Sequence, residues 1–547
     1  MQNRLKHPVL PPLAAAAMML LVTLPLLGLP PLAGTEGHRV IPARHMLESG
    51  DWMVPELLGE TYLRKPPGHF WLLAASQAVL GNHGWAWRLP SALSGVLLVA
   101  GLAWMGRRWF GVGAGWAAGI GGVGLVAIWA QSRTADIDAA NTLASFLAAI
   151  ALLELMLGHP GRRWAWSLLL ALSLGAALLL KLHAGLSLVG GALLAGTILG
   201  GVRAAGRPGV WLGLTGGIAL FFAWVVPVAL RVGGGGDTSG VEEAALNVFR
   251  VSRLLEAIET QGLLVLYAMP MSLVLLISPR LLTRAWESRS AVSHRRLTLG
   301  LVLTLAIGHA LLLINGVANV RYGYVLLPIW PLLAASAAAA WRDRRLTARD
   351  QSFLEWVLAA TSVAIPVGAV VLAGVLWGRS LDFAARPWLI AAFVAGPVAA
   401  ALSLFAWGTR RRGIGVALVA VGLLTLAPPM VVLQTQQRFE KSGREAGRVL
   451  SEALPPGAMV HADALVRDKP EVFVYAAGVE VRSRQRRFLQ PQRVGVEAGH
   501  YLALTQSEWR RWRETDNAPR LQAITELPTR EDRPAVLVRV AGQTHSP

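Results

Sequence analysis

The sequence predicts an all-α polytopic membrane protein, and its composition and its long apolar runs both lead to this prediction. Of the 547 residues, 54% are hydrophobic and only 15% are Asp, Glu, Lys or Arg, whereas soluble globular proteins average about 25% charged residues. Uncharged runs at 9–31, 209–230 and 414–433 reach the roughly 20 residues that cross the hydrocarbon core of a bilayer. The chain is therefore expected to lie mostly within a membrane.

Hydropathy and length predict about thirteen transmembrane helices. They lie near residues 9–32, 89–106, 112–130, 139–157, 164–180, 184–200, 209–230, 262–278, 297–314, 323–340, 354–377, 387–407 and 413–433. Together they form a predicted transmembrane module over residues 1–433, whose two halves look unrelated.

Loop charge predicts the orientation of these helices. The formal net charge is +19, which in a soluble protein would suggest a nucleic-acid partner. Here the positive-inside rule explains it, because short loops that alternate along the chain are rich in arginine, among them Arg107-Arg108, Arg162-Arg163 and Arg410-Arg411-Arg412. We expect a multi-pass protein of the inner (plasma) membrane with a cytoplasmic N-terminus, contacts with membrane lipids and no nucleic-acid partner.

The first long loop, residues 33–88, is expected on the extracytoplasmic face. Residues 40–49 predict an amphipathic interfacial helix that has Pro42 in its first turn and stops at Gly50, and 70–80 predict a second one. Between them, Pro66 and Pro67 restrict the backbone of Lys65, next to Arg64. A cation held in this way suits a phosphate, although snorkelling to lipid phosphates is the alternative.

The tail, residues 434–547, is more polar and predicts a small extracytoplasmic α/β domain. Strand-like stretches lie at 472–477 and 535–540, and a helix-like stretch lies at 507–514. The chain contains no cysteine, which excludes a disulfide framework and a thiolate metal site.

Charged residues near the extracytoplasmic helix ends are candidates for a site, because ionisable groups at membrane depth are costly. Asp136 and Asp138 precede or open the fourth helix, close to Arg133. N-capping explains one aspartate at a helix start, but not two. Lys181 ends the fifth helix and Arg321 opens the tenth, and the alternative for Lys181 is a favourable helix-dipole contact. Arg253 is a further candidate for the donor phosphate, with a helix-surface ion pair as its alternative.

The first loop also carries an ordered series of motifs. It reads Glu36…Arg44…Met46-Leu47-Glu48-Ser49-Gly50-Asp51-Trp52…Pro55…Lys65-Pro66-Pro67…Trp71…Gly81…Arg88-Leu89-Pro90-Ser91. This series resembles the membrane glycosyltransferases of the GT-C class, in particular the lipid A aminoarabinose transferases and the dolichyl-phosphate-mannose-protein mannosyltransferases. The match is clear over residues 1–145, and the rest of the chain agrees in layout.

The resemblance implies an inverting glycosyltransferase. A sugar would leave a polyprenyl-phosphate donor and join a lipid, glycan or protein acceptor at the extracytoplasmic face. Glu36, Asp138 and Asp136 are then the candidate catalytic residues. The candidate substrate-binding residues are Lys65, Arg64, Arg88, Arg133, Lys181, Arg321 and Arg253.

Two positions depart from the pattern of the family. An acidic pair with an essential aspartate opens the first loop in the family, but here the pair reads Thr35-Glu36. The aminoarabinose transferases have a zinc-binding Glu before the KPP lysine, where this chain has Arg64. The sequence therefore requires no cofactor and gives no metal ligands. A catalytically altered or inactive assembly protein stays an alternative, as does a transporter, which would predict interrupted helices and two related halves.

Overall fold

The computed structural model describes most of the chain, with gaps. The described residues are 7–158, 161–181, 185–233, 254–277, 279, 292–317, 319–342, 346–381, 383–409, 412–462, 465–466, 469–476, 480–483, 500–514, 521–529 and 534–540. They fall into two compact units. The helical unit comprises 1–27, 88–227 and 240–434, and the loop–tail unit comprises 28–87, 228–239 and 435–547.

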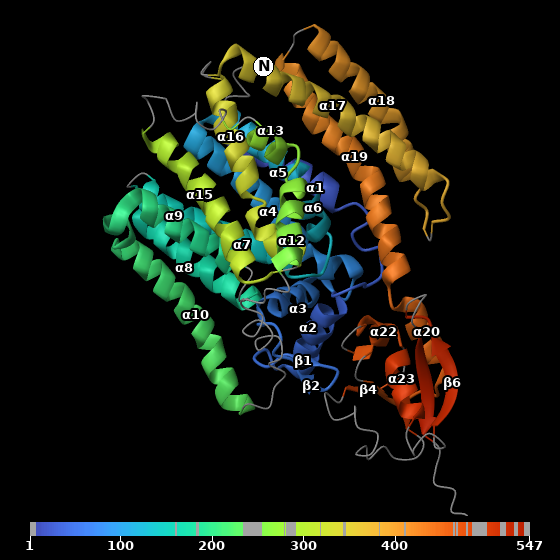
Figure 1. Cartoon of the computed structure of the whole chain (residues 1–547). Helices are drawn as coiled ribbons and strands as arrows, with labels where there is room; N and C mark the ends of the chain where they lie inside the picture. The colour runs from blue at the N-terminus through green and yellow to red at the C-terminus, as the bar shows by residue number, and fades with distance from the viewer. Residues whose placement is uncertain are drawn as a thin grey trace, which may run out of the picture. The chain divides into compact units, whose positions relative to one another are not determined.

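The helical unit is built from apolar helices (Figure 1). They are α1 (Leu10–Thr23), α4 (Gly84–Phe110), α5 (Val112–Gly124), α6 (Val126–Ser132), α7 (Asp138–Leu157), α8 (Arg163–Leu180), α9 (Leu186–Ala205), α10 (Pro208–Val232), α12 (Leu254–Tyr267), α13 (Met271–Ile277), α15 (Val292–Ile314), the 3₁₀ helix η3 (Val320–Leu326), α16 (Ile329–Arg342), α17 (Ala348–Trp377), α18 (Arg386–Gly408) and α19 (Arg412–Lys441).

Among the described residues, ten helices are long and apolar enough to cross a membrane, or eleven if the bent pair α5 and α6 forms one span. The chain is a multi-pass membrane protein, but the predicted thirteen spans are not all continuous helices. The run at 9–32 yields only the 14 residues of α1, because Pro25, Gly28 and Pro30 follow its end and proline cannot continue a helix. The run at 262–278 divides into α12 and α13, with Pro270 between them.

Helix α7 lies at the centre of the helical unit. It packs against α8 and α9, and α9 packs against α15 (Figure 1). Nearly nine tenths of the apolar stretch of α7 is buried, and Phe146 on this helix is completely buried. An apolar helix surrounded on all sides by protein is a core helix rather than a lipid-facing one. The first residue of α7, Asp138, is therefore held by the most buried element of the unit.

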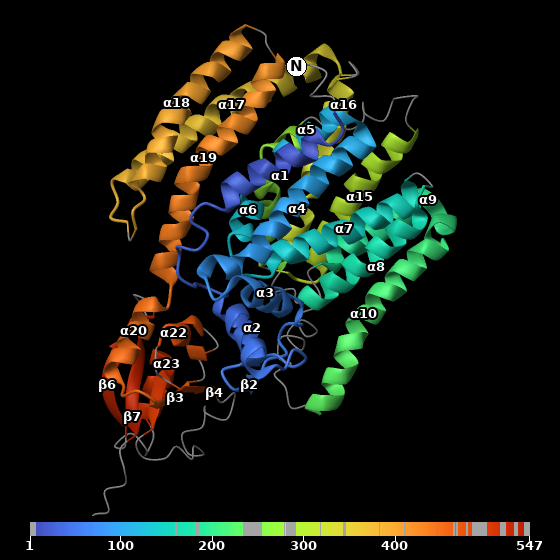
Figure 2. The same cartoon turned by 180° about the vertical axis from the view of Figure 1, so that it is seen from behind.

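The loop–tail unit combines the first loop with the C-terminal segment, seen from behind in Figure 2. The elements of the first loop are α2 (Gly37–Ser49), β1 (Glu56–Leu57), β2 (Glu60–Thr61) and α3 (Gly68–Leu80). Those of the C-terminal segment are α20 (Arg444–Ala453), β3 (Met459–Ala462), α22 (Glu471–Val474), β4 (Glu480–Ser483), β5 (Tyr501–Leu504), α23 (Gln506–Arg513), β6 (Leu521–Leu527) and β7 (Ala535–Val540). The five strands β4-β3-β5-β7-β6 form one mixed sheet, parallel at the β4-β3-β5 side and antiparallel beyond it.

The described part of the tail contains helices and a mixed sheet, and one of its predicted strands is a helix. Strand β7 occupies 535–540 and α23 covers most of 507–514. The strand-like stretch 472–477 instead contains the short helix α22, which follows Pro470 and has Glu471 in its first turn. A proline just ahead of a helix and an acidic first turn both favour a helix start, and here they outweigh the β preference of the valines and aromatic residues.

Both predicted helices of the first loop form. Helix α2 ends at Gly50, which has φ +74°, the left-handed conformation that glycine adopts at a helix end. It begins at Gly37, so Pro42 lies inside the helix rather than in its first turn. Proline has no N–H to pair with the carbonyl of His38, and the guanidinium of Arg39 donates to that carbonyl at 3.4 Å.

Candidate functional site

Two carboxylates and two cations meet at one end of the helical unit. Asp138 Oδ1 lies 2.7 Å from Lys181 Nζ, and Asp138 Oδ2 accepts from Arg321 Nε at 3.0 Å and Nη2 at 2.6 Å. Arg321 Nη2 also donates to Asp136 Oδ2. The residues come from the start of α7, the end of α8 and η3, which are far apart in the sequence. We call these four residues the outer ion cluster.

The outer ion cluster is buried on its acidic side and open at Arg321. The side chains of Asp138 and Lys181 are 4% and 7% exposed, and that of Arg321 is 36% exposed. Unpaired ions in such surroundings would cost several kcal/mol each, so the four groups neutralise one another. An anion approaching the cluster would meet the guanidinium first, and a guanidinium matches the geometry of a phosphate.

Local backbone geometry shows that Asp138 is not a helix cap. Ile137 is the N-cap residue of α7 and makes no side-chain capping hydrogen bond, and Asp138 is the first residue of the helix. Asp136 instead accepts the N–H of Ile137 at 2.8 Å, and its carbonyl accepts the hydroxyl of Ser91 at 2.9 Å. The carboxylate of Asp138 is thereby left to the two cations. Ser91, the last residue of the Arg-Leu-Pro-Ser motif, is a supporting residue that sequence reasoning did not assign.

The two cations are held by their own local structure. Lys181 follows the last turn of α8, where its N–H donates to the carbonyl of Ala177. Its ammonium lies 4.0 Å from the centre of the Tyr322 ring, a cation–π contact. Asn319 caps η3 and accepts the N–H of Arg321 at 3.0 Å. Asn319 and Tyr322 stand beside Arg321 in the sequence, but only the fold shows what they contact.

Two arginines whose substrate-binding role stays a prediction contact the last residue of α1 and the segment that follows it. Arg88 is completely buried and donates to the carbonyl of Leu27 at 3.0 Å. Arg133 donates to the carbonyls of Thr23 and Pro25 at 2.6 and 2.7 Å. The last carbonyls of a helix have no partners within the helix, so these contacts stabilise the exit of the first helix.

Glu36, the predicted catalytic residue of the first loop, is buried and contacts Arg438 and the backbone of Ala33. It is only 1% exposed, its Oε2 lies 2.8 Å from Arg438 Nη1, and the same oxygen accepts the N–H of Ala33 at 3.1 Å. These contacts fix the chain at the start of α2. The place of Glu36 in catalysis therefore stays a prediction.

Asp51 of the Ser-Gly-Asp-Trp motif organises the turn after α2. Its carboxylate accepts the N–H groups of Met53 and Val54 and lies 2.9 Å from Arg231 Nη2. Partial burial acts to raise the pKa of Asp51, but these hydrogen bonds and the arginine together bring it below the ordinary value. The motif thus contains an ionised carboxylate that holds a turn.

The Lys-Pro-Pro stretch lies between β2 and α3. Arg64 and Lys65 are both half-buried there, and their role as phosphate ligands stays a prediction. Among the described residues, no three His, Asp or Glu side chains gather closely enough to hold a metal ion, and Arg64 is a cation. The residues around Arg64 therefore do not fit the zinc site that the resemblance to the aminoarabinose transferases implies. Arg253 lies outside the described residues.

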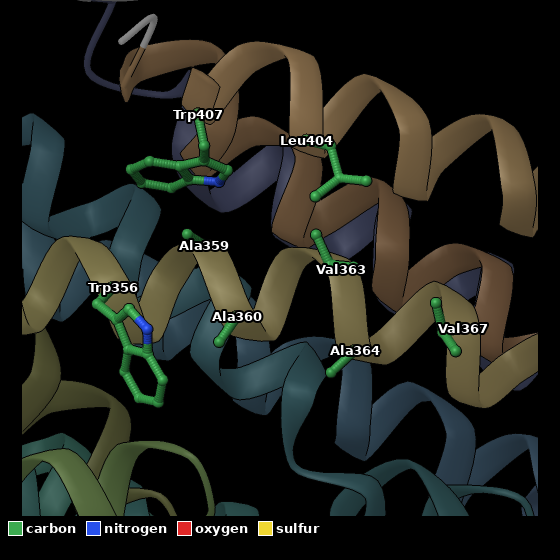
Figure 3. A pocket seen from close by; sticks show the side chains of 8 residues that line it. All are labelled: Trp356, Ala359, Ala360, Val363, Ala364, Val367, Leu404 and Trp407. Atoms are coloured by element: carbon green, nitrogen blue, oxygen red, sulfur yellow. The ribbon is translucent and has the colours of Figure 1, made fainter. Parts of the chain in front are cut away.

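A shallow groove elsewhere in the helical unit has a different character. It lies between α17 and α18 and is lined by Trp356, Ala359, Ala360, Val363, Ala364, Val367, Leu404 and Trp407 (Figure 3). Its lining is almost entirely apolar, and both helices are long enough to cross a membrane. Such a groove offers no group for sugar or phosphate chemistry.

Comparison with known proteins points to one class of enzyme. The family described as dolichyl-phosphate-mannose-protein mannosyltransferase matches residues 64–226. Two curated relatives carry the name undecaprenyl phosphate-alpha-4-amino-4-deoxy-L-arabinose arabinosyl transferase. The protein from Pseudomonas fluorescens is 33% identical over 129 residues, 23% of this chain and 22% of the relative. The one from Pseudomonas savastanoi pv. phaseolicola is 39% identical over 72 residues, 12% of this chain and 14% of the relative. These matches span less than a quarter of the relatives' length.

The fold comparison extends over almost the whole chain. The crystal structure of ArnT from Cupriavidus metallidurans bound to undecaprenyl phosphate aligns with a TM-score of 0.69 and 19% identity, and covers 98% of this chain and 99% of that protein. The apo form of the same protein gives a TM-score of 0.66. This chain thus has the fold of a solved aminoarabinose transferase and resembles the membrane glycosyltransferases of the GT-C class.

Proposed function

We propose that the chain is an inverting glycosyltransferase that takes a sugar from a polyprenyl-phosphate donor at the extracytoplasmic face of the inner membrane. The outer ion cluster carries this proposal, because it places two cations and two carboxylates together at the end of apolar helices. The fold shared with ArnT from Cupriavidus metallidurans, whose crystal structure is bound to undecaprenyl phosphate, supports the choice of donor. The acceptor is a lipid, a glycan or a protein.

Donor binding would reorganise the outer ion cluster. The cations are neutralised by Asp136 and Asp138 in this structure, and Arg321 is the most exposed of the four. A phosphate group that binds Arg321 and Lys181 would form ion pairs with both cations and weaken their ion pairs with Asp138. The same step that binds the donor therefore releases a carboxylate, and fixed cations stabilise the charge that develops on the departing phosphate.

The released carboxylate would act as a general base. The acceptor hydroxyl attacks the anomeric carbon from the face opposite the phosphate, its proton passes to Asp138, and the carbon–oxygen bond to the phosphate breaks. The electron pair of that bond stays on the polyprenyl phosphate. A positioned base typically contributes about 10²–10⁴-fold to a rate. Arg64, Lys65 and Arg253 remain expected phosphate ligands in this scheme, and Glu36 remains an alternative base.

Transfer by the purified protein tests the proposal. The full chain is placed in lipid nanodiscs with undecaprenyl phosphate that carries 4-amino-4-deoxy-L-arabinose or other sugars, together with lipid A, glycan or protein acceptors. Mass spectrometry should detect free undecaprenyl phosphate that forms only when an acceptor is present. ArnT from Cupriavidus metallidurans serves as the positive control. If that control is active and the folded chain releases no carrier from any donor, the proposal is wrong.

A further inference from the structure

A second buried charge cluster lies within the loop–tail unit. It contains Glu36 and Arg438, paired at 2.8 Å, and the carboxylate of Glu471. Glu471 is completely buried, and neither of its carboxylate oxygens has a hydrogen-bond partner on another described residue. Leaving a buried carboxylate without partners is costly, so an unpaired carboxylate in the interior requires an explanation.

The C-terminal segment holds the start of the first loop at four successive points. The hydroxyl of Tyr475 accepts the N–H of Leu32, and the backbone of Ala33 pairs with Ser442. Arg438 pairs with Glu36. At the next residue, a Cβ on Gly37 would lie 2.8 Å from the backbone nitrogen of Glu471, so only glycine allows this approach. These contacts fix the backbone on both sides of Thr35-Glu36.

Burial is the main reason that Glu471 favours its protonated form. Burial raises the pKa of Glu471, its own backbone N–H and the charge of Lys469 lower it, and the negative charge of Glu36 raises it, so that the pKa reaches about 7. The ammonium of Lys469 donates to the carbonyls of Lys441 and Thr529 rather than to Glu471.

Several charged side chains on the helices that pack against α22 pair elsewhere. Helix α20 packs against α22, but the side chains of Glu445, Arg448 and Glu452 on α20 pair with one another on an exposed face. On α2, which also packs against α22, the guanidinium of Arg39 donates to the carbonyl of His38 and to the hydroxyl of Tyr62. Glu36 and Glu471 therefore lie in one buried region, where Arg438 pairs with Glu36.

We propose that Arg438 and Glu471 are positioning residues for the Thr35-Glu36 pair, and that ionisation of Glu471 beside Glu36 loosens the hold of the C-terminal segment on the first loop. The inference rests on the proposed function for its effect on sugar transfer, because Thr35-Glu36 occupies the acidic-pair position of the resembled family. The hold on residues 32–37 exists independently of any activity.

The sign of the pH effect follows from the raised pKa. A carboxyl whose pKa is higher in the folded state than in the unfolded state stabilises the fold below its ordinary pKa, near 4.5, and loses that contribution as pH rises toward 7. The equilibrium that opens the cluster should therefore increase by up to about ten-fold per pH unit between these values and level off above them. Glu471→Gln keeps the shape of the side chain and removes the titration.

Hydrogen exchange measured on the full chain in nanodiscs tests this inference. The opening of residues 32–37, corrected for the intrinsic pH dependence of exchange, should rise steeply from pH 5 to pH 7 in the wild type and stay flat in Glu471→Gln. The exposed Glu452→Gln is the matched control and should behave like the wild type. Arg438→Lys keeps the charge that Glu36 needs and should open more than the wild type with the same pH dependence. Parallel profiles for wild type and Glu471→Gln would overturn the inference.

The pH profile of sugar transfer separates positioning from simple stability. If the chain transfers sugar, the rate at saturating donor should fall several-fold as pH rises from 5 to 7 in the wild type, relative to Glu471→Gln at the same pH, and equal profiles would exclude a positioning role. If no transfer occurs with any donor, the proposed function fails, whereas the exchange experiment still decides whether Glu471 controls the hold on the loop.

Discussion

The role of Asp138 suggested by the sequence differs from the contacts that its side chain makes in the structure. At a helix start, the simplest interpretation of an aspartate is capping. The structure instead directs its two oxygens to Lys181 and Arg321, and the neighbouring Asp136 accepts the N–H of Ile137. The choice between the two interpretations depended on residues some 40 and 180 positions away, which no local pattern reveals.

Replacing Asp138 should abolish most sugar transfer, while its loss of thermal stability should be no larger than that caused by replacing another buried, paired carboxylate. Asp138→Asn removes the proposed base and the charge that balances Lys181, so we expect a rate reduced by about 10²–10⁴-fold. The measurement is the rate of carrier release in nanodiscs, alongside the melting temperature.

Glu154→Gln is the matched control for this variant. Glu154 lies on the same helix, is equally buried and pairs with Arg108 at 2.6 Å. At the rise of an α-helix, Glu154 lies about 24 Å from Asp138 along the helix axis. Both variants should lower the melting temperature, because each leaves a cation without its carboxylate. Only Asp138→Asn should lose transfer, and equal transfer rates in the two would exclude Asp138 from catalysis.

At the scale of elements, the hydrophobic pattern predicted most helices and missed their breaks. Ten predicted spans correspond to single long helices, because about 20 apolar residues are a strong signal. Prolines and short irregular stretches divide the runs at 9–32 and 262–278, and α5 and α6 meet at a 64° bend. The helix α22 was missed for another reason, since four residues are too few for a period to be recognised.

The contact between α2 and α22 predicts that Gly37 tolerates no side chain. In Gly37→Ala the new methyl group would meet the backbone of Glu471 at 2.8 Å and the ring of Pro470 at 3.1 Å. Overpacking of this kind typically costs about 1–3 kcal/mol of unfolding free energy. Thermal unfolding followed by a probe in the tail should show a lower midpoint.

Gly374→Ala is the comparison for this substitution, because a Cβ there meets no atom within 4 Å and alanine favours a helix. It should leave the midpoint unchanged or slightly higher. If Gly37→Ala behaves in the same way, α2 and α22 do not pack as described.

At the scale of the whole molecule, the sequence predicted a multi-pass protein and an α/β tail, but not how the chain groups into units. The division into domains at 1–433, with the first loop at 33–88, and 434–547 stays a prediction, and by its contacts the chain forms one compact unit from residues 28–87, 228–239 and 435–547. Contacts such as Leu32 to Tyr475, 443 residues apart, leave no trace in composition or periodicity. The outer ion cluster was partly predictable, because its four charged residues break apolar runs, whereas Ser91, Asn319 and Tyr322 gave no comparable signal.

The predicted orientation is testable with single cysteines, since the natural chain has none. Gln522→Cys in the tail and Gly161→Cys in an arginine-rich loop are both at exposed positions. A membrane-impermeant maleimide applied to spheroplasts should label position 522 at once and position 161 only after permeabilisation, because arginine-rich loops face the cytoplasm. The reverse pattern would place the tail and the first loop on the cytoplasmic side.

The structure of the chain in nanodiscs with undecaprenyl phosphate tests the central claim most directly. We predict that the phosphate lies within about 4 Å of the Arg321 guanidinium and of Lys181 Nζ, the range of an ion pair, with at least one contact to Asp138 broken. A phosphate bound elsewhere, with Arg321 still paired to Asp136 and Asp138, would contradict the account.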